Sequence, residues 1–190
     1  MLAHALKEWA VICRALEQGK QTIVFRKGGL VEPDGEFGVE HKRFWLYPTY
    51  IHQQEAGIKP EFKPLLKESE ADKPPAGIIC LSHFAEVEAV YQLHDMVGAL
   101  LLSPLHIYSK ETVHARFRYR SPGLFVLVLR VYSAGQVSEL AESAAYAGCK
   151  SWVELDHPLA TKPRTPVLSD EQFTSGARTI HDLLNPIALT

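Results

Sequence analysis

Cysteine is scarce in this sequence, with three in 190 residues, widely spaced and without a C-x-x-C pair. A disulfide framework or a zinc ribbon needs paired cysteines, so both classes of fold are excluded. The same scarcity suits a reducing compartment, and we expect a cytoplasmic protein.

Long hydrophobic runs are also missing, even at the apolar N-terminus. Lys7, Glu8 and Arg14 interrupt the first 19 residues. This stretch therefore lacks both the apolar region of a signal peptide and the length of a membrane span. We expect a soluble protein without a membrane partner.

An excess of charge of one sign is absent as well, because 20 lysines and arginines nearly balance 22 aspartates and glutamates. A nucleic-acid partner would have to be bound by a local cationic patch. The sequence also lacks the GxxxxGK[ST], GxGxxG and HExxH motifs, which bind phosphates, dinucleotides and zinc. We expect no cofactor and no bound metal.

Apolar residues make up 46% of the chain, enough for one hydrophobic core over residues 1–190. A polar, proline-rich excursion interrupts this single domain at residues 54–76. The unbroken apolar run at residues 124–132 predicts a central strand. We expect an α+β fold whose bent mixed sheet, or partly closed β-barrel, is flanked by an N-terminal and a C-terminal helix.

Apolar spacing and turn residues predict the remaining elements. The spacing of Leu2, Leu6 and Trp9 predicts a helix over residues 3–18. Ser169 begins a capping box, which predicts a C-terminal helix. Further strands are expected at residues 21–27, 37–47, 77–89 and 151–155, and further helices at 95–102 and 109–117.

An anion site is indicated where the strand at 21–27 ends in Arg26, Lys27, Gly28 and Gly29. A guanidinium fork, an ammonium group and glycine amides together suit a phosphate or a carboxylate. A solvated strand end with a flexible turn is the alternative interpretation. Five residues from later segments are expected to complete the site: His41, His52, Gln53, Trp152 and Glu154.

The cationic turn and the loop YPTYIHQ (residues 47–53) are expected to share this site, although about twenty residues separate them. The strands at 21–27 and 37–47 would pair as neighbours, most simply antiparallel. An extra reversal of the chain near residues 35–38 would then be needed to bring the two motifs together.

Three arginines, Arg116, Arg118 and Arg120, alternate with Phe117 and Tyr119. If this segment is extended, the arginines share one face and suit the phosphate backbone of a nucleic acid. A solvated edge strand over a core contact is the alternative.

A different class of function is indicated by Asp34, Glu40 and Lys42, which form a D-x5-E-x-K series. Metal-dependent nucleases hold a divalent ion with two such carboxylates, while the lysine assists the attacking water. The usual spacing in those enzymes is longer. His52 and Glu154 would instead serve a nucleoside-processing enzyme.

Six blocks of sequence are distinctive: ALKEW (residues 5–9), RKGG (26–29), FGVEH (37–41), YPTYIHQ (47–53), LVLRVY (127–132) and GCKSWVEL (148–155). Together they resemble an uncharacterised bacterial domain-of-unknown-function family over nearly the whole chain. The resemblance implies no reaction.

A second, weaker similarity is to the ASCH and PUA-like superfamily of small β-barrels. Its motif Gly-x-Lys-x-x-Glu-x-Arg falls here on Gly19, Gln21, Val24 and Arg26, so the glycine and arginine match while the lysine and glutamate do not. The similarity implies binding of RNA or modified nucleosides. The two missing residues argue against the amidohydrolase chemistry of some members.

We therefore expect the protein to bind a phosphate-bearing ligand, which is RNA, DNA or a nucleotide, at a cationic cleft. The alternatives are a hydrolase acting on nucleic acid or nucleosides, and a protein-interaction module.

Overall fold

Residues 1–27, 41–148 and 150–185 are described by a computed structural model of the protein. Its centre is a seven-stranded mixed sheet in the order β2-β5-β4-β3-β1-β6, with β7 pairing with β5. The strands are β1 (Leu2–Trp9), β2 (Ile23–Arg26), β3 (Arg43–Thr49), β4 (Ile78–Leu93), β5 (Leu124–Ala141), β6 (Trp152–Leu159) and β7 (Thr165–Pro166).

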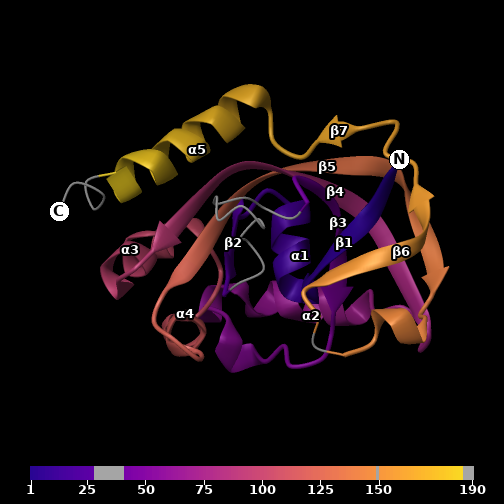
Figure 1. Ribbon diagram of the computed structural model, residues 1–190, viewed down its shortest axis with the longest axis horizontal. Helices are drawn as coiled ribbons and strands as arrows, with labels where there is room; N and C mark the ends of the chain where they lie inside the picture. The colour runs from indigo at the N-terminus through magenta and orange to yellow at the C-terminus, as the bar shows by residue number, and fades with distance from the viewer. Residues whose placement is uncertain (28–40, 149, 186–190) are drawn as a thin grey trace.

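Among the described residues, five α-helices connect or cover these strands (Figure 1). They are α1 (Ala10–Glu17), α2 (Lys63–Ala71), α3 (Met96–Leu101), α4 (Lys110–Arg118) and α5 (Asp170–Leu184). Short 3-10 turns lie at Glu55–Gly57, Pro60–Phe62, Ser103–Leu105 and Ala144–Tyr146. None of the described helices is long and apolar enough to cross a membrane.

The sheet curves strongly around α1 (Figure 1). The register between β4 and β5 shifts at Leu81/His83 and again at Val87/Ala89, and such irregularities bend a strand pair and increase its twist. β2 and β6 stand at the two ends of the strand order. The α+β fold with a bent mixed sheet is therefore confirmed, as an open sheet in the described part of the chain.

The predicted central strand is confirmed and is longer than expected. β5 pairs with β2 on one side and with β4 on the other. Leu127 is fully buried between them. An apolar run without alternation is what a strand covered on both faces requires.

The predicted helix at residues 3–18 is wrong in its first half. β1 pairs in parallel with β3 and antiparallel with β6, and the helix begins at Ala10. Ala5 and Leu6 are both buried but belong to separate core clusters. Hydrogen bonds to strands on both sides override the helical spacing of the apolar residues, which here reflects burial on both faces of a strand.

Two further predictions changed in detail. β3 continues through Pro48 to Thr49 instead of ending before the proline, while residues 37–40 lie outside the described residues. The excursion at 54–76 contains α2, which packs on the core through Leu65 and Leu66. The N-caps Asp95, Ser109 and Ser169 are confirmed, the last as a complete capping box.

Candidate functional site

A cavity of about 710 Å³ opens where the parallel strands β1 and β3 both end. Such a volume is typical of a small-molecule site, and ligands of open sheets commonly bind at the carboxyl ends of strands. The cavity is lined by the ends of both strands, by Arg26 of β2 and by Arg116 of α4. The curvature of the sheet brings these four elements together, because β2 and β1 are far apart in the strand order.

Glu8 is the buried carboxylate at the wall of this cavity, and its side chain is 3% exposed. Both carboxylate oxygens are bound by Arg116, with Nη2 to Oε1 at 2.9 Å and Nη1 to Oε2 at 3.2 Å. Arg26 Nη1 lies 3.4 Å from Oε2. Burial raises the pKa of Glu8, but the two guanidinium groups outweigh it and hold the pKa below its usual value. Glu8 is therefore an ionised structural anion.

Arg116 is held by stacking as well as by charge. Its guanidinium carbon lies 5.0 Å from the ring centre of Trp9 and 4.6 Å from that of Tyr108. Nη1 also donates to the carbonyl of Phe25 at 3.1 Å. Burial lowers the pKa of Arg116, but Glu8 more than compensates and raises it above its usual value. The side chain is fixed in one orientation.

Arg26 is held less completely. Its Nη1 donates to Lys7 O at 3.2 Å as well as to Glu8, and the side chain is 12% exposed. Within the described part of the chain, Nη2 and Nε of Arg26 make no hydrogen bond. Burial lowers the pKa of Arg26, although a guanidinium stays charged at neutral pH. Arg26 therefore combines a fixed position with free donors at the cavity wall.

The loop after β3 forms another part of the wall. His52 lines the cavity with a φ of 67°, in the left-handed region that a residue with a Cβ seldom adopts. The next residue fixes the loop, because Gln53 Oε1 accepts a hydrogen bond from the amide of Val11 at 3.2 Å. Lys73 Nζ lies 5.4 Å from the ring centre of Tyr50. A strained backbone held by its surroundings is common at functional sites.

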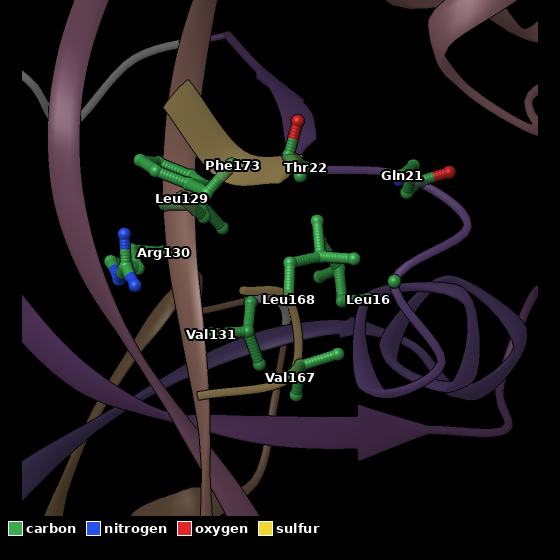
Figure 2. A pocket seen from close by; sticks show the side chains of 10 residues that line it. Leu16, Gln21, Thr22, Leu129, Arg130, Val131, Val167, Leu168 and Phe173 are labelled. Atoms are coloured by element: carbon green, nitrogen blue, oxygen red, sulfur yellow. The ribbon is translucent and has the colours of Figure 1, made fainter. Parts of the chain in front are cut away.

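A second cavity, between β5 and the start of α5, is too small for a ligand. Its volume of about 10 Å³ is near the minimum for one water molecule. Figure 2 shows Leu16, Val131 and Leu168 converging on it. It is a packing gap under the segment that leads into α5.

A family model matches residues 5–179, which is most of the chain. The model is described as Domain of unknown function (DUF1802). The chain belongs to this family. No curated protein matches this DUF1802 member in sequence.

Three of the solved structures similar to this DUF1802 member come from Zymomonas mobilis. The structure of ASCH has a TM-score of 0.46 and 15% identity and covers 93% of each chain. A mutant of the same protein, ZmASCH, gives 0.46 and 14%, over 92% of this chain and 94% of the other. A second mutant gives 0.45 and 14%, over 92% and 96%. The resemblance to a domain-of-unknown-function family is thus confirmed.

The DUF1802 structure brings Arg26 and His52 to the wall of the same cavity. It does so without the predicted pairing of their strands, since β5, β4 and β3 follow β2 in the sheet order. The predicted pairing is wrong. The curvature of the whole sheet brings the two residues together instead. The expected reversal near residues 35–38 lies outside the described residues, as do Gly28 and Gly29.

Two other residues of the expected anion site are engaged within the protein. Lys27 Nζ donates to the carbonyls of Phe117 at 2.8 Å and Gly123 at 2.7 Å, and also to that of Ser121. Gln53 anchors the start of α1, as described above. Both are positioned by backbone groups and are not among the residues that line the cavity.

His41, Trp152 and Glu154 lie apart from the lining of the cavity. His41 stacks on His4 with a centroid distance of 3.5 Å and meets the Trp152 ring edge-on at 5.2 Å. Glu154 is opposite His4 in the pairing of β1 with β6. These residues form a group of their own, made by β1, β6 and the residue two positions before β3.

The extended arginine stripe does not form, because Arg116 and Arg118 belong to α4. Residues two apart on a helix point to different sides, and the Ser109 cap makes this segment helical. Arg120 follows the helix with a φ of 62°. The three arginines therefore have different surroundings.

Asp34 and Glu40 lie outside the described residues, and Lys42 is exposed just before β3. Among residues 1–27, 41–148 and 150–185, no group of three histidine, cysteine, aspartate or glutamate side chains is placed to hold a metal ion.

Glu8, Trp9 and Tyr108 are site residues that sequence reasoning missed. Glu8 lies off the apolar stripe of the helix predicted over residues 3–18, but this segment is a strand. The sequence contains one signal for a buried ion pair here. Glu8 and Trp9 immediately precede an apolar helix, and a charged residue at the end of a strand needs a partner when it is buried. Nothing local in sequence indicates that Arg116, 108 residues later, supplies it.

Proposed function

We propose that the protein binds a phosphate-bearing nucleotide in the cavity at the ends of β1 and β3. The observation that carries the proposal is the charge of the lining, in which, among the residues that the structure describes, cationic side chains outnumber carboxylates by five to two. The cations are Lys7, Arg26, Lys73, Arg116 and Lys150, and the carboxylates are Glu8 and Glu142.

Arg26 is the residue best placed to bind the phosphate. Glu8 fixes one of its terminal nitrogens, and Glu8 is in turn held by Arg116. The remaining donors of Arg26 are thus ordered before a ligand arrives, and the loss of side-chain freedom on binding is small. A guanidinium presents its donors in a fork that matches phosphate oxygens.

Aromatic side chains provide a place for a base or sugar next to this charge. Trp9, Tyr47 and Tyr50 all line the cavity. Tyr50 is partly exposed and already lies beside a cation, Lys73. Aromatic rings stack on bases in nucleotide and single-strand sites.

The same geometry makes Glu8 a support for the binding groups and argues against a role for it as a general base. Glu8 is buried, its oxygens both accept hydrogen bonds, and its pKa is lowered. A general base needs a free oxygen and a pKa near the working pH. The carboxylate therefore supports the binding groups.

The test is the replacement of Arg26 by glutamine in the full chain. Loss of a charge-assisted hydrogen bond costs about 1.5–3 kcal/mol, so the affinity for adenosine or uridine 5′-monophosphate should fall about tenfold to a hundredfold by titration calorimetry. Because Arg26 also pairs with Glu8, the melting temperature is measured alongside.

The matched control is Arg178→Gln, which removes an exposed arginine of α5 whose side chain is 82% exposed. This control should bind both nucleotides as the wild type does. A folded Arg26→Gln protein with unchanged affinity for both nucleotides would contradict the proposal, and so would a wild type that binds neither.

A further inference from the structure

The end of α4 carries an exposed group of three residues, Arg118, Tyr119 and Arg120, called here the arginine tip. Tyr119 is 57% exposed, and the Arg120 guanidinium lies 5.2 Å from its ring centre. In the described part of the chain, neither Arg118 nor Arg120 pairs with a carboxylate. The arginines are therefore not needed to neutralise buried charge.

The backbone of the arginine tip is strained and held in place. The amide of Ser121 donates to Tyr119 O at 2.8 Å across Arg120, whose φ is 62°. A two-residue hydrogen bond around a positive φ is the γ-turn of the rare, strained kind. Strain of this sort persists only where the surroundings enforce it.

Lys27 is the group that enforces it. Its ammonium binds the carbonyls of Phe117, Ser121 and Gly123, which enclose the arginine tip on both sides. The last carbonyls of a helix carry partial negative charge, and Phe117 belongs to the last turn of α4. By offsetting the negative charge of these three carbonyls, Lys27 leaves a cationic surface that does not repel a phosphate.

The arginine tip is also connected to the cavity. Arg116, two residues before it, lines the cavity, and Lys27 directly follows Arg26 of the cavity wall. Because Arg26 lines the cavity and the ammonium of the adjacent Lys27 binds the carbonyls around the arginine tip, the arginine tip lies close to the Arg26 side of the cavity.

We propose that the arginine tip binds the continuation of a single-stranded nucleic acid whose terminal nucleotide occupies the cavity. Arg118 and Arg120 contact backbone phosphates, and the exposed ring of Tyr119 stacks on a base. A duplex does not fit this surface, because its base faces are already covered by stacking. The inference rests on the proposed function and names its ligand as a polynucleotide.

The test compares three ligands on the full chain: uridine 5′-monophosphate, the single-stranded RNA octauridylate with its DNA counterpart octathymidylate, and an RNA duplex of eight base pairs. The octamers should bind at least tenfold more tightly than the mononucleotide and the duplex. Comparison of the RNA and DNA octamers shows whether the sugar matters.

Two sets of variants separate charge from stacking. Arg118→Gln with Arg120→Gly removes both cations and leaves a residue that accepts the positive φ. Octamer affinity should fall at least tenfold, and the slope of log affinity against log salt should lessen by about 1.4, or 0.7 for each lost phosphate contact. Tyr119→Ala should weaken the octamer about tenfold, Tyr119→Phe should not, and no variant should change mononucleotide affinity.

Several results would overturn the inference. These are an octamer that binds no more tightly than the mononucleotide, equal binding of the duplex, or an octamer that is indifferent to the arginine tip variants. An effect of the arginines without one of Tyr119→Ala would show a surface for any polyanion, and would also overturn it.

Failure of the proposed function has a different signature. If Arg26→Gln weakens the mononucleotide while the arginine tip variants change nothing, the cavity stands and the arginine tip does not. If the arginine tip variants weaken the octamer while Arg26→Gln has no effect on any ligand, the cavity proposal fails and the arginine tip remains a nucleic-acid surface.

Discussion

Glu8 shows how one buried carboxylate can organise residues that are distant in sequence. It joins β1 to Arg26 of β2 and to Arg116 of α4. Burying a charge is costly unless each of its hydrogen-bonding positions is satisfied. Two arginines and the amide of Trp9, which donates to Oε1 at 3.0 Å, provide that here. The site therefore depends on a charge that a ligand does not need to touch.

Replacing Glu8 by glutamine should destabilise the protein by about 3–5 kcal/mol, because two arginines lose their buried partner. The wild type should also be sensitive to acid in a defined direction. The folded state holds Glu8 ionised at a pKa below the ordinary value of 4.5, so the unfolded state binds more protons. The stabilisation is fully present above about pH 4.5 and is lost as the pH falls through the folded pKa.

Urea unfolding between pH 3 and pH 7 measures this effect, and Glu17 provides a control of opposite sign. Burial raises the pKa of Glu17, so ionisation of that group weakens the fold as the pH rises. Glu8→Gln should flatten the rise of stability with pH, whereas Glu17→Gln should steepen it. The same slope in the wild type and in Glu8→Gln would contradict the assignment of Glu8.

The left-handed backbone conformation of His52 is expected to lower the stability of the protein. A left-handed conformation costs a residue with a Cβ about 1–2 kcal/mol, whereas glycine adopts it freely. His52→Gly should therefore be more stable than His52→Ala by about 1 kcal/mol in urea unfolding, while both variants lose the imidazole at the cavity wall. Equal stability of the two variants would mean that the loop relaxes when the histidine is removed.

At the scale of elements, the burial of β5 predicts that truncating one of its core side chains destabilises the protein. Leu127 is fully buried and pairs with Val24 of β2 and Val90 of β4. Leu127→Ala should cost about 2–5 kcal/mol, through lost transfer free energy and the cavity left behind. The midpoint of urea unfolding measures this, with Val137→Ala as the control, since Val137 lies on the same strand but is 59% exposed.

Elements whose signals are local could be predicted from the sequence. The capped starts of α3, α4 and α5 and the apolar run of β5 each depend on neighbouring residues. β1 could not be predicted, because its strand conformation is imposed by β3 and β6. Apolar residues that serve two faces of a strand can reproduce the spacing of one face of a helix.

At the scale of the whole molecule, the candidate site arises from curvature. The sequence indicated Arg26 and His52 as partners, and both line the cavity. Neither the route by which they meet nor the Glu8–Arg116 pair could be predicted, because both depend on how far the sheet bends around α1. Pairing rules identify strand neighbours, but they do not specify which residues face one another across a bent sheet.

The position of β1 between β3 and β6 has a consequence for synthesis of the chain. Ala5 pairs with Trp45 on one side and with Val153 on the other. β1 is synthesised before β6 and therefore acquires its second neighbour only when residues 152–159 have emerged. Until then one edge of β1 is exposed to wrong pairing. A chaperone that shields this segment during translation would protect the strand that carries Glu8.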